Sequence, residues 1–250
     1  MKYGLIGEKL GHSYSKLIHE KLADYTYDLC PLPKEDFKIF MKEKNFKAIN
    51  VTIPYKREVL PYLSQLDQKA KQIGAVNTIV NDNGNLIGYN TDYDGFLYTL
   101  NKHKLEIASK KVLVIGNGGA AQAVFAVLKD LNAGEIITVK YKKELGTVTY
   151  EEAALHHNDA SFLINTSPIG MYPNVDACPM DLTPYTQLIA VVDLIYNPTT
   201  TRLMEQAIKK NVLAVNGLEM LIAQAKYAVE HFLSIQIKDE VIDQIYEELR

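Results

Sequence analysis

The sequence lacks several features that would place a protein in a functional class at once. Its 250 residues include no tryptophan and only two cysteines, so a disulfide framework or a cysteine-based metal site is excluded. Its six histidines show no spacing typical of metal ligands. The sequence also has no G-x-S-x-G motif and no cysteine–histidine pattern that would indicate a covalent nucleophile.

Charge of one sign and long apolar runs are equally scarce. The formal net charge of −3 gives no electrostatic reason to expect nucleic acid or an anionic membrane as a partner. No stretch approaches the length of a membrane span, and residues 1–7 contain too short an apolar run for a signal peptide. We therefore expect a cytoplasmic monomer or homodimer that binds a small molecule.

What the sequence does contain is an alternation of strand-like apolar runs and helix-like periods. This alternation predicts an α/β fold with mostly parallel strand pairing. A polar segment without apolar periodicity, residues 101–110, is the expected domain boundary. The last amphipathic helix, 238–249, is expected to pack back on the first domain, because chain termini tend to lie close together in one domain.

The stretch Asn50-Val51-Thr52-Ile53-Pro54-Tyr55-Lys56 has the most informative pattern of the first half. Asn50 and Thr52 share one face of a predicted strand, 48–53, because side chains alternate along a strand. Pro54 fits the first turn of a helix, which we expect over 55–60. Lys56 would then lie in a first helical turn, where the helix dipole disfavours a cation, and this position favours a chemical role over a stabilising one. A solvated first-turn lysine fits these residues equally well.

The second half opens with the pattern of a dinucleotide-binding turn. A buried strand, 111–115, precedes Gly116-Asn117-Gly118-Gly119-Ala120-Ala121 and a helical segment, so the G-x-G-x-x-A motif has the required context. Gly116 would permit the tight turn, and Gly118 would let the backbone approach a pyrophosphate. The alternative is a tight strand–helix turn without a ligand.

The next predicted strand, 134–139, ends in lysines instead of the acidic residue that an NAD site usually has. Lys140, Lys142 and Lys143 could neutralise a 2′-phosphate, which favours NADP. A solvated basic turn is the alternative. Further along, Gly217, Met220 and Gln224 share one face of a predicted helix that runs to 233.

These motifs together resemble the shikimate dehydrogenase family over nearly the whole length of the chain. The resemblance rests on separated motifs in the family's order: Ser13-Tyr14-Ser15 with His19, residues 50–56, Gly74-Ala75-Val76-Asn77-Thr78, Gly88-Tyr89-Asn90-Thr91-Asp92, the glycine turn, residues 165–171, residues 193–198 and residues 217–225. It implies a two-domain fold with a cleft between the domains. Residues 1–101, completed by helices within 218–250, would be the substrate domain, and 102–217 would be a doubly wound Rossmann-like domain that binds NADP.

The resemblance also implies roles for individual residues. Lys56 and Asp92 would be the catalytic pair. Substrate would be bound by Ser13, Ser15, Thr52, Asn77, Tyr196 and Gln224, with Asn50 in support. The cofactor would be bound by Gly116, Asn117, Gly118, Gly119, Ala120, Lys140, Leu194, Gly217 and Met220. Several of these residues have a structural explanation as well: helix N-caps for the serines and Asp92, a backbone-bonded strand asparagine for Asn77, and core packing for Met220 and Gln224.

The family's Asn-Arg-Thr sequence is replaced here by Lys140-Tyr141-Lys142, and the segment after Leu145 is shorter than in the family. The implied reaction is reversible reduction of 3-dehydroshikimate to shikimate with NADPH, and NAD is not excluded. The alternatives are a shikimate/quinate dehydrogenase with relaxed cofactor use, another two-domain dehydrogenase, and a shikimate-binding homologue that has lost its cofactor.

Overall fold

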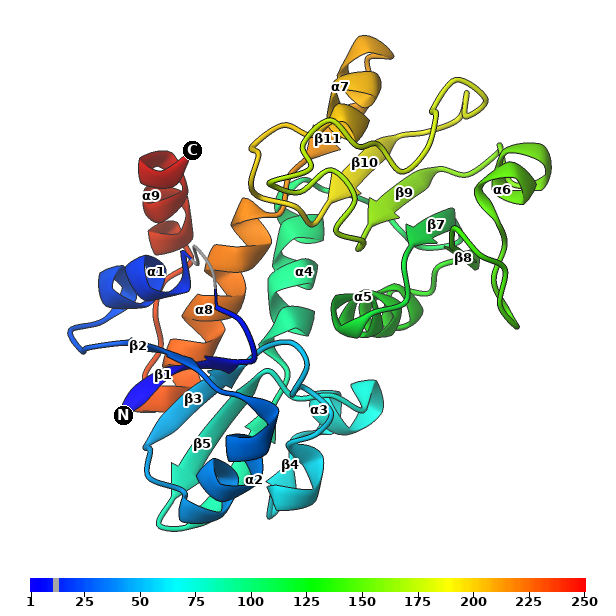
Figure 1. Cartoon of the computed structure of the whole chain (residues 1–250). Helices are drawn as coiled ribbons and strands as arrows, with labels where there is room; N and C mark the ends of the chain where they lie inside the picture. The colour runs from blue at the N-terminus through cyan, green and yellow to red at the C-terminus, as the bar shows by residue number, and fades with distance from the viewer. Residues whose placement is uncertain (11–13) are drawn as a thin grey trace. The chain divides into compact units, whose positions relative to one another are not determined.

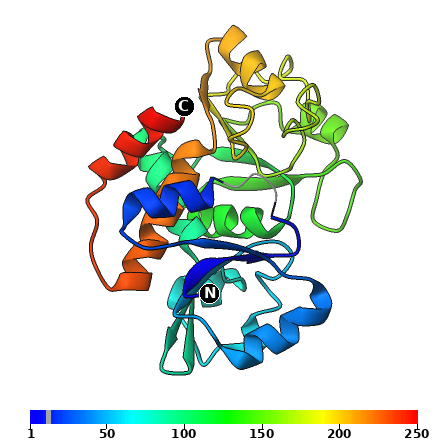
Figure 2. The ribbon, with the colours of Figure 1, turned by 60° about the vertical axis from the view of Figure 1, so that its left-hand side comes forward.

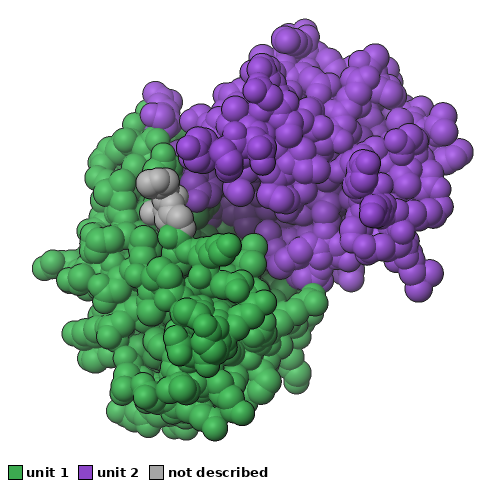
Figure 3. Space-filling view, in the orientation of Figure 1, with its two compact units in different colours: residues 1–96, 221–249 green, residues 97–220, 250 purple. Residues whose placement is uncertain are grey.

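The computed structural model describes residues 1–10 and 14–250. The chain forms two compact units, one of residues 1–96 and 221–249 and one of residues 97–220 and 250 (Figure 3). The chain passes from one unit to the other inside two helices, α4 (Thr91–Lys102) and α8 (Leu218–Leu233), and again at its last residue, Arg250. No helix among the described residues is long and apolar enough to cross a membrane.

Unit 1, which comprises residues 1–96 and 221–249, is built on a mixed sheet with the strand order β2-β1-β3-β5-β6-β4. Pairing is parallel between β1 and both its neighbours, while β5 is antiparallel to β3 and β6. The strands are β1 (Tyr3–Gly7), β2 (Asp28–Pro31), β3 (Ala48–Val51), β4 (Gln65–Leu66), β5 (Thr78–Asp82) and β6 (Asn85–Tyr89). Asn83 and Gly84 both have positive φ, as the tight turn between β5 and β6 requires.

Helices cover both faces of this sheet. Phe37 and Met41 of α2 share one core with Ile49 of β3, and Phe232 of α8 shares another with Tyr3 of β1. Figure 1 and Figure 2 show α1 and α9 side by side next to α8. The shorter helices of this unit are α1 (Ser15–Leu22), α2 (Lys34–Glu43), α3 (Gln68–Ile73) and α9 (Glu240–Leu249).

The prediction of a helix over 55–60 is wrong. Residues 53–59 form successive turns, followed by one turn of 3₁₀ helix at Leu60–Tyr62. An α-helix would need the Lys56 carbonyl to accept from Leu60, but it accepts from the backbone N–H of Val76 at 2.8 Å, and the Leu60 N–H donates to Arg57 instead. Pro61 also has no N–H to continue the helix. The helix-dipole argument for Lys56 therefore does not hold.

The strand predicted before this turn is also inaccurate at its end. It is expected over 48–53, but β3 ends at Val51. Strand β4 has only two residues and was not predicted. Such short or terminal segments depend on tertiary hydrogen bonds, which the apolar pattern does not record.

Unit 2, which comprises residues 97–220 and 250, contains a fully parallel sheet with the order β11-β10-β9-β7-β8. This is the Rossmann-like arrangement that the sequence predicts. Its strands are β7 (Lys111–Ile115), β8 (Glu135–Val139), β9 (Phe162–Asn165), β10 (Ala190–Asp193) and β11 (Leu213–Val215). Its helices other than α4 and α8 are α5 (Gly119–Asp130), α6 (Tyr150–His156) and α7 (Arg202–Lys209).

The shortened segment after Leu145 lies at the outer edge of β8. There the described chain makes an isolated parallel bridge between Val139 and Val148 where a full strand could pair. Helix α6 follows after one residue, Thr149, which forms a capping box with Glu152. The segment therefore contains one helix and pairs with β8 through a single bridge.

Candidate active site

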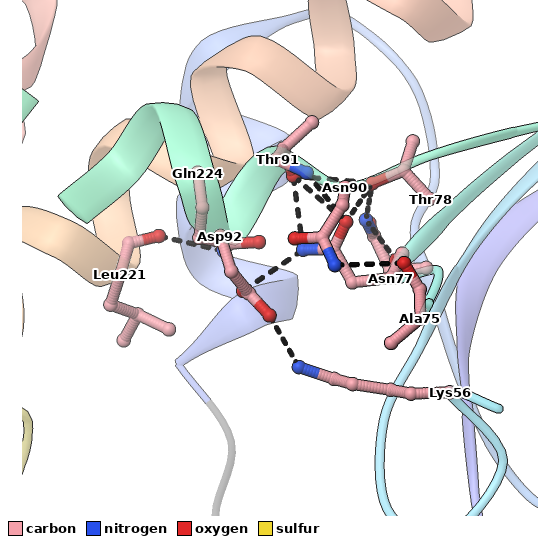
Figure 4. Close-up of polar contacts among 10 residues, drawn as sticks. Lys56, Ala75, Asn77, Thr78, Asn90, Thr91, Asp92, Leu221 and Gln224 are labelled. Atoms are coloured by element: carbon pink, nitrogen blue, oxygen red, sulfur yellow. Dashed lines mark hydrogen bonds and ion pairs between the residues drawn. The ribbon is translucent and has the colours of Figure 1, made fainter. Parts of the chain in front are cut away.

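Lys56 and Asp92 form a partly buried ion pair in unit 1. Lys56 Nζ donates to Asp92 Oδ2 at 2.6 Å, and the two side chains are 16% and 11% exposed (Figure 4). The Val76 N–H fixes the Lys56 carbonyl, which positions the lysine backbone directly after β3. Asp92 lies in the first turn of α4, where the helix dipole favours an anion. The structure thus brings together an amine and a carboxylate that lie 36 residues apart.

The side-chain amide of Asn77 holds the other oxygen of Asp92. Asn77 Nδ2 donates to Asp92 Oδ1 at 2.9 Å and to Thr91 Oγ1 at 3.1 Å. Asn77 Oδ1 accepts from the Thr91 N–H at 2.8 Å and from the Thr78 hydroxyl at 3.0 Å. These contacts occupy both N–H groups and both lone pairs of the amide. The described contacts of Asn77 are therefore those of a group that orients Asp92, and its role as a substrate ligand stays a prediction.

The remaining predicted substrate residues are distributed over both units. Gln224 is on α8 in unit 1, and its Nε2 donates to the Leu221 carbonyl at 2.7 Å (Figure 4). Thr52 follows β3, and Ser15 is the first residue of α1. Tyr196 belongs to unit 2 and follows β10. Ser13 lies outside the described residues.

The glycine turn of unit 2 has the geometry of a phosphate-binding turn. Gly116 has φ +98°, and a Cβ there would lie 2.9 Å from Thr166 Oγ1, so a side chain is excluded on two grounds. Gly118 immediately precedes α5, and a Cβ there would meet nothing within 4 Å. Gly118 provides no side-chain cap for α5. Open space beside the uncapped N-terminus of a helix fits a nucleotide pyrophosphate, which would lie along Gly116, Asn117, Gly118, Gly119 and Ala120.

Leu194 and Gly217 meet at the carboxyl ends of β10 and β11. A Cβ on Gly217 would lie only 2.0 Å from the Leu194 carbonyl oxygen, so glycine is required for this close approach. Met220 lies in the first turn of α8 and is buried. These three residues therefore follow the same edge of the sheet as the glycine turn, which is the edge where parallel sheets bind ligands.

The basic segment after β8 begins beside the glycine turn, since the Gly116 N–H donates to the Val139 carbonyl at 3.0 Å. Lys140 pairs with Glu144, and Lys143 pairs with Glu152. Two of the three lysines expected to meet a 2′-phosphate are thus already paired with carboxylates. The cofactor role of Lys140 remains a prediction.

Two features of the site were not predicted from the sequence. One is a buried set of hydroxyl and amide groups around Asn77, which includes Thr78 and Thr91. The other is Asp193, a fully buried carboxylate at the end of β10 whose pKa is raised, mainly because burial disfavours its charged form. Only the position of Asp193 at a strand's carboxyl end could have signalled it.

The fold and the site together define a two-unit α/β protein that joins a Rossmann-like sheet to a unit carrying a partly buried lysine–aspartate pair. Comparison with known proteins narrows this class. A family model described as the shikimate dehydrogenase substrate binding domain matches residues 5–79. The chain is 39% identical to "Shikimate dehydrogenase (NADP(+))" of Clostridium beijerinckii, over 98% of this chain and 96% of the relative.

Solved structures agree with this result. A chorismate mutase/shikimate 5-dehydrogenase fusion protein from Clostridium acetobutylicum superposes with a TM-score of 0.92 at 39% identity, covering 99% of this chain and 96% of the other. The shikimate 5-dehydrogenase of Thermus thermophilus, in complex with NADP(H) and shikimate, gives a TM-score of 0.88 at 26% identity, with 100% of both chains covered. The chain belongs to the shikimate dehydrogenase family.

Proposed function

We propose that this chain is an NADP-dependent shikimate dehydrogenase, which reversibly reduces 3-dehydroshikimate to shikimate. The observation that carries the proposal is the Lys56–Asp92 pair, with 2.6 Å between Nζ and Oδ2, in a chain that also has a phosphate-binding glycine turn. Unit 1 would bind the substrate and unit 2 the nucleotide. The names of the relatives support both the substrate and the cofactor.

The lysine performs the acid–base half of the reaction. NADPH, when bound, supplies a hydride to the substrate carbonyl carbon. The electron pair of the C=O bond then moves to the oxygen, which takes a proton from Lys56 Nζ and becomes the hydroxyl of shikimate. Asp92 Oδ2 accepts a hydrogen bond from Nζ throughout and holds the amine in position. Positioned proton donors of this kind contribute roughly 10²–10⁴-fold to rate.

The other polar residues would recognise the substrate. Ser13 and Ser15 would bind its carboxylate with help from Tyr196. Thr52 and Gln224 would bind ring hydroxyls, and Asn77 would do so by exchanging one of its present contacts. Support for Gln224 comes from its place on α8 in unit 1, the unit that carries the Lys56–Asp92 pair.

The cofactor would lie along the carboxyl edge of the unit 2 sheet. The turn at 116–120 would bind the pyrophosphate, while Leu194, Gly217 and Met220 would line the nicotinamide. Lys140 would contact the 2′-phosphate, and this contact favours NADP over NAD. We further propose that the protein acts in the cytoplasm as a monomer or homodimer.

Shikimate oxidation by the purified chain tests this proposal. The appearance of reduced cofactor at 340 nm is recorded with NADP⁺ and with NAD⁺, and with shikimate and with quinate. We expect shikimate to be oxidised with NADP⁺, and the KM for NADP⁺ to be lower than the KM for NAD⁺. Equal use of quinate would favour a shikimate/quinate dehydrogenase. An absence of turnover, together with shikimate binding and no NADPH binding by calorimetry, would replace the proposal with a shikimate-binding protein.

A further inference from the structure

A buried series of hydrogen bonds connects Tyr27 to Asp92 through three intermediate side chains. Tyr27 donates to Asn50 Oδ1 at 2.7 Å, and Asn50 Nδ2 donates to Thr78 Oγ1 at 3.0 Å. Thr78 donates to Asn77 Oδ1 at 3.0 Å, and Asn77 Nδ2 reaches Asp92 Oδ1 at 2.9 Å. All five residues are buried and belong to unit 1. The series therefore lies entirely within the unit that carries the catalytic pair.

The phenol of Tyr27 fixes the direction of the first two bonds. Burial raises the pKa of Tyr27 well above its usual value, so the phenol keeps its proton and acts as a donor. The Asn50 oxygen must then face Tyr27, and its NH₂ group must face the other way. That NH₂ group donates both to Thr78 Oγ1 and to the Asn77 backbone carbonyl, which is 3.2 Å away.

The Thr78 hydroxyl in turn helps to fix the orientation of the Asn77 side-chain amide. A hydroxyl has one proton, and Thr78 Oγ1 already accepts from Asn50. The nearer acceptor for that proton is Asn77 Oδ1 at 3.0 Å, while Thr91 Oγ1 lies at 3.2 Å and can itself be the donor in that contact. The Thr91 N–H donates to the same oxygen at 2.8 Å, so the two donors agree on the orientation of the amide. The Asn77 NH₂ group is thereby turned toward Asp92 Oδ1, which leaves Oδ2 for Lys56.

We propose that Thr78 and Tyr27 are positioning residues that orient the Asn77 amide and, through it, the carboxylate of Asp92 against Lys56. This inference rests on the proposed function, because orienting Asp92 against Lys56 affects turnover only if these two residues are the catalytic pair. Without the Thr78 hydroxyl the Asn77 oxygen loses one of three donors, and only the N–H and the hydroxyl of Thr91 remain. In the rotated amide an oxygen would face Asp92 Oδ1, and two acceptors in contact would push the carboxylate away from Nζ.

A pair of substitutions at Thr78 tests the proposal. Thr78→Val keeps the shape of the side chain and removes the hydroxyl, whereas Thr78→Ser keeps the hydroxyl and removes a methyl group. We expect Thr78→Val to lower kcat by about tenfold or more while KM for shikimate changes less than about threefold, since Asn77 is only one of several substrate ligands, whereas its amide is the group that holds Asp92 Oδ1. Thr78→Ser should retain kcat within about threefold. Equal kcat in the valine and serine variants would overturn the proposal.

Tyr27→Phe tests the far end of the series, with Tyr185→Phe as a matched control. Tyr185 is also fully buried, but its hydroxyl has no hydrogen-bond partner among the described residues and it lies in the unit 2 core. Tyr27→Phe should lower kcat by a factor of about two to five, and Tyr185→Phe should leave it unchanged. Equal effects of the two variants on kcat would contradict a positioning role for Tyr27.

A crystal structure of the Thr78→Val variant separates this inference from the proposed function. We expect a rotated Asn77 amide or a lengthened Nζ–Oδ2 distance, whatever the activity. Wild-type geometry at Asn77, Asp92 and Lys56 in that variant would overturn the positioning role. An inactive wild-type protein would overturn the proposed function instead.

Discussion

Two buried aspartates, Asp92 in unit 1 and Asp193 in unit 2, occupy opposite electrostatic environments. Asp92 pairs with the ammonium group of Lys56, and its side chain retains 11% exposure. Asp193 is fully buried and accepts from Asn165 Nδ2 at 3.0 Å, the Thr201 hydroxyl at 2.7 Å and the Ile195 N–H at 3.1 Å. Those three donors are neutral.

This difference fits a catalytic role for the carboxylate of Asp92 and a structural role for that of Asp193. Asp92 contacts the amine of Lys56, and its side chain keeps some access to solvent. Asp193 links the end of β9, the loop after β10 and the N-cap of α7, because its donors come from those three segments. We therefore expect substitutions of the two residues to affect different measurements.

The largest expected effect is on turnover when the ion pair is broken. Lys56→Ala removes the proton donor, and we expect kcat to fall by about 10³-fold, with a smaller change in KM for shikimate. Asp92→Asn keeps the shape of the carboxylate but not its charge, and should lower kcat by about 10²-fold. Steady-state kinetics measures both effects. A loss confined to KM in both variants would contradict the roles assigned to the pair.

Truncation at Asp193 should primarily lower stability. Asp193→Ala leaves the Asn165, Ile195 and Thr201 donors without their buried acceptor, at a cost of about 3 kcal/mol or more in the free energy of unfolding. Asp193→Asn can accept from Asn165 and Ile195 and donate to Thr201, so its cost should stay within about 1 kcal/mol. Urea denaturation monitors both variants. Equal stability of the alanine variant and the wild type would show that the three donors find other partners.

The pH dependence of stability should also differ between wild type and Asp193→Asn. The pKa of Asp193 is raised above its ordinary value of 3.8 in the folded protein, so its contribution is fully present below pH 3.8 and is lost as the pH rises through the folded pKa. The stability of the wild type relative to Asp193→Asn should therefore fall as the pH is raised from about 3.8. An increase in the stability of the wild type relative to Asp193→Asn as the pH rises would contradict the raised pKa of Asp193.

Comparing the wild type with Asp193→Asn also cancels the contribution of His19, whose effect on stability changes with pH in the opposite direction. Burial lowers the pKa of His19 from 6.5 to about 3, so the neutral ring stabilises the fold above pH 6.5 and that stability is lost as the pH falls toward 3. Both proteins contain His19, and its contribution cancels in their difference.

The smallest expected effect concerns Glu144, the carboxylate that pairs with Lys140 at the exposed end of β8. An exposed pair of this kind contributes little to stability. Glu144→Gln should leave Lys140 available for a 2′-phosphate and lower the Kd for NADP⁺ by a factor of about two to five, with no change for NAD⁺. Calorimetry with the two cofactors measures this effect, and NAD⁺ serves as the internal control. An equal gain for both cofactors would contradict the contact between Lys140 and the 2′-phosphate.

The sequence predicted the Rossmann-like sheet well because its strands are short apolar runs bounded by glycine and turn residues, such as Lys111–Ile115 before Gly116. It failed at 55–60, where a hydrogen bond from Val76 to the Lys56 carbonyl overrides local helix propensity. That bond joins residues 20 positions apart, and no local pattern records it.

In the candidate site, too, some residues could be predicted from the sequence and others could not. Family resemblance indicated Lys56 and Asp92, but the residues alone gave no reason to pair them. The side chains that orient them could not be predicted, because Tyr27, Asn50 and Thr78 meet only after β3 and β5 pair. Their donor and acceptor directions follow from burial and atomic contacts, which exist only in the folded chain.

The rate of hydride transfer in a single turnover, followed at 340 nm with saturating shikimate and NADP⁺, tests the role of the lysine–aspartate pair most directly. We expect Lys56→Ala to slow this step by at least about 10²-fold relative to wild type, while the Kd for shikimate changes less than about tenfold. An unchanged rate of this step in Lys56→Ala, with only the shikimate affinity reduced, would show that the lysine binds substrate and does not move the proton.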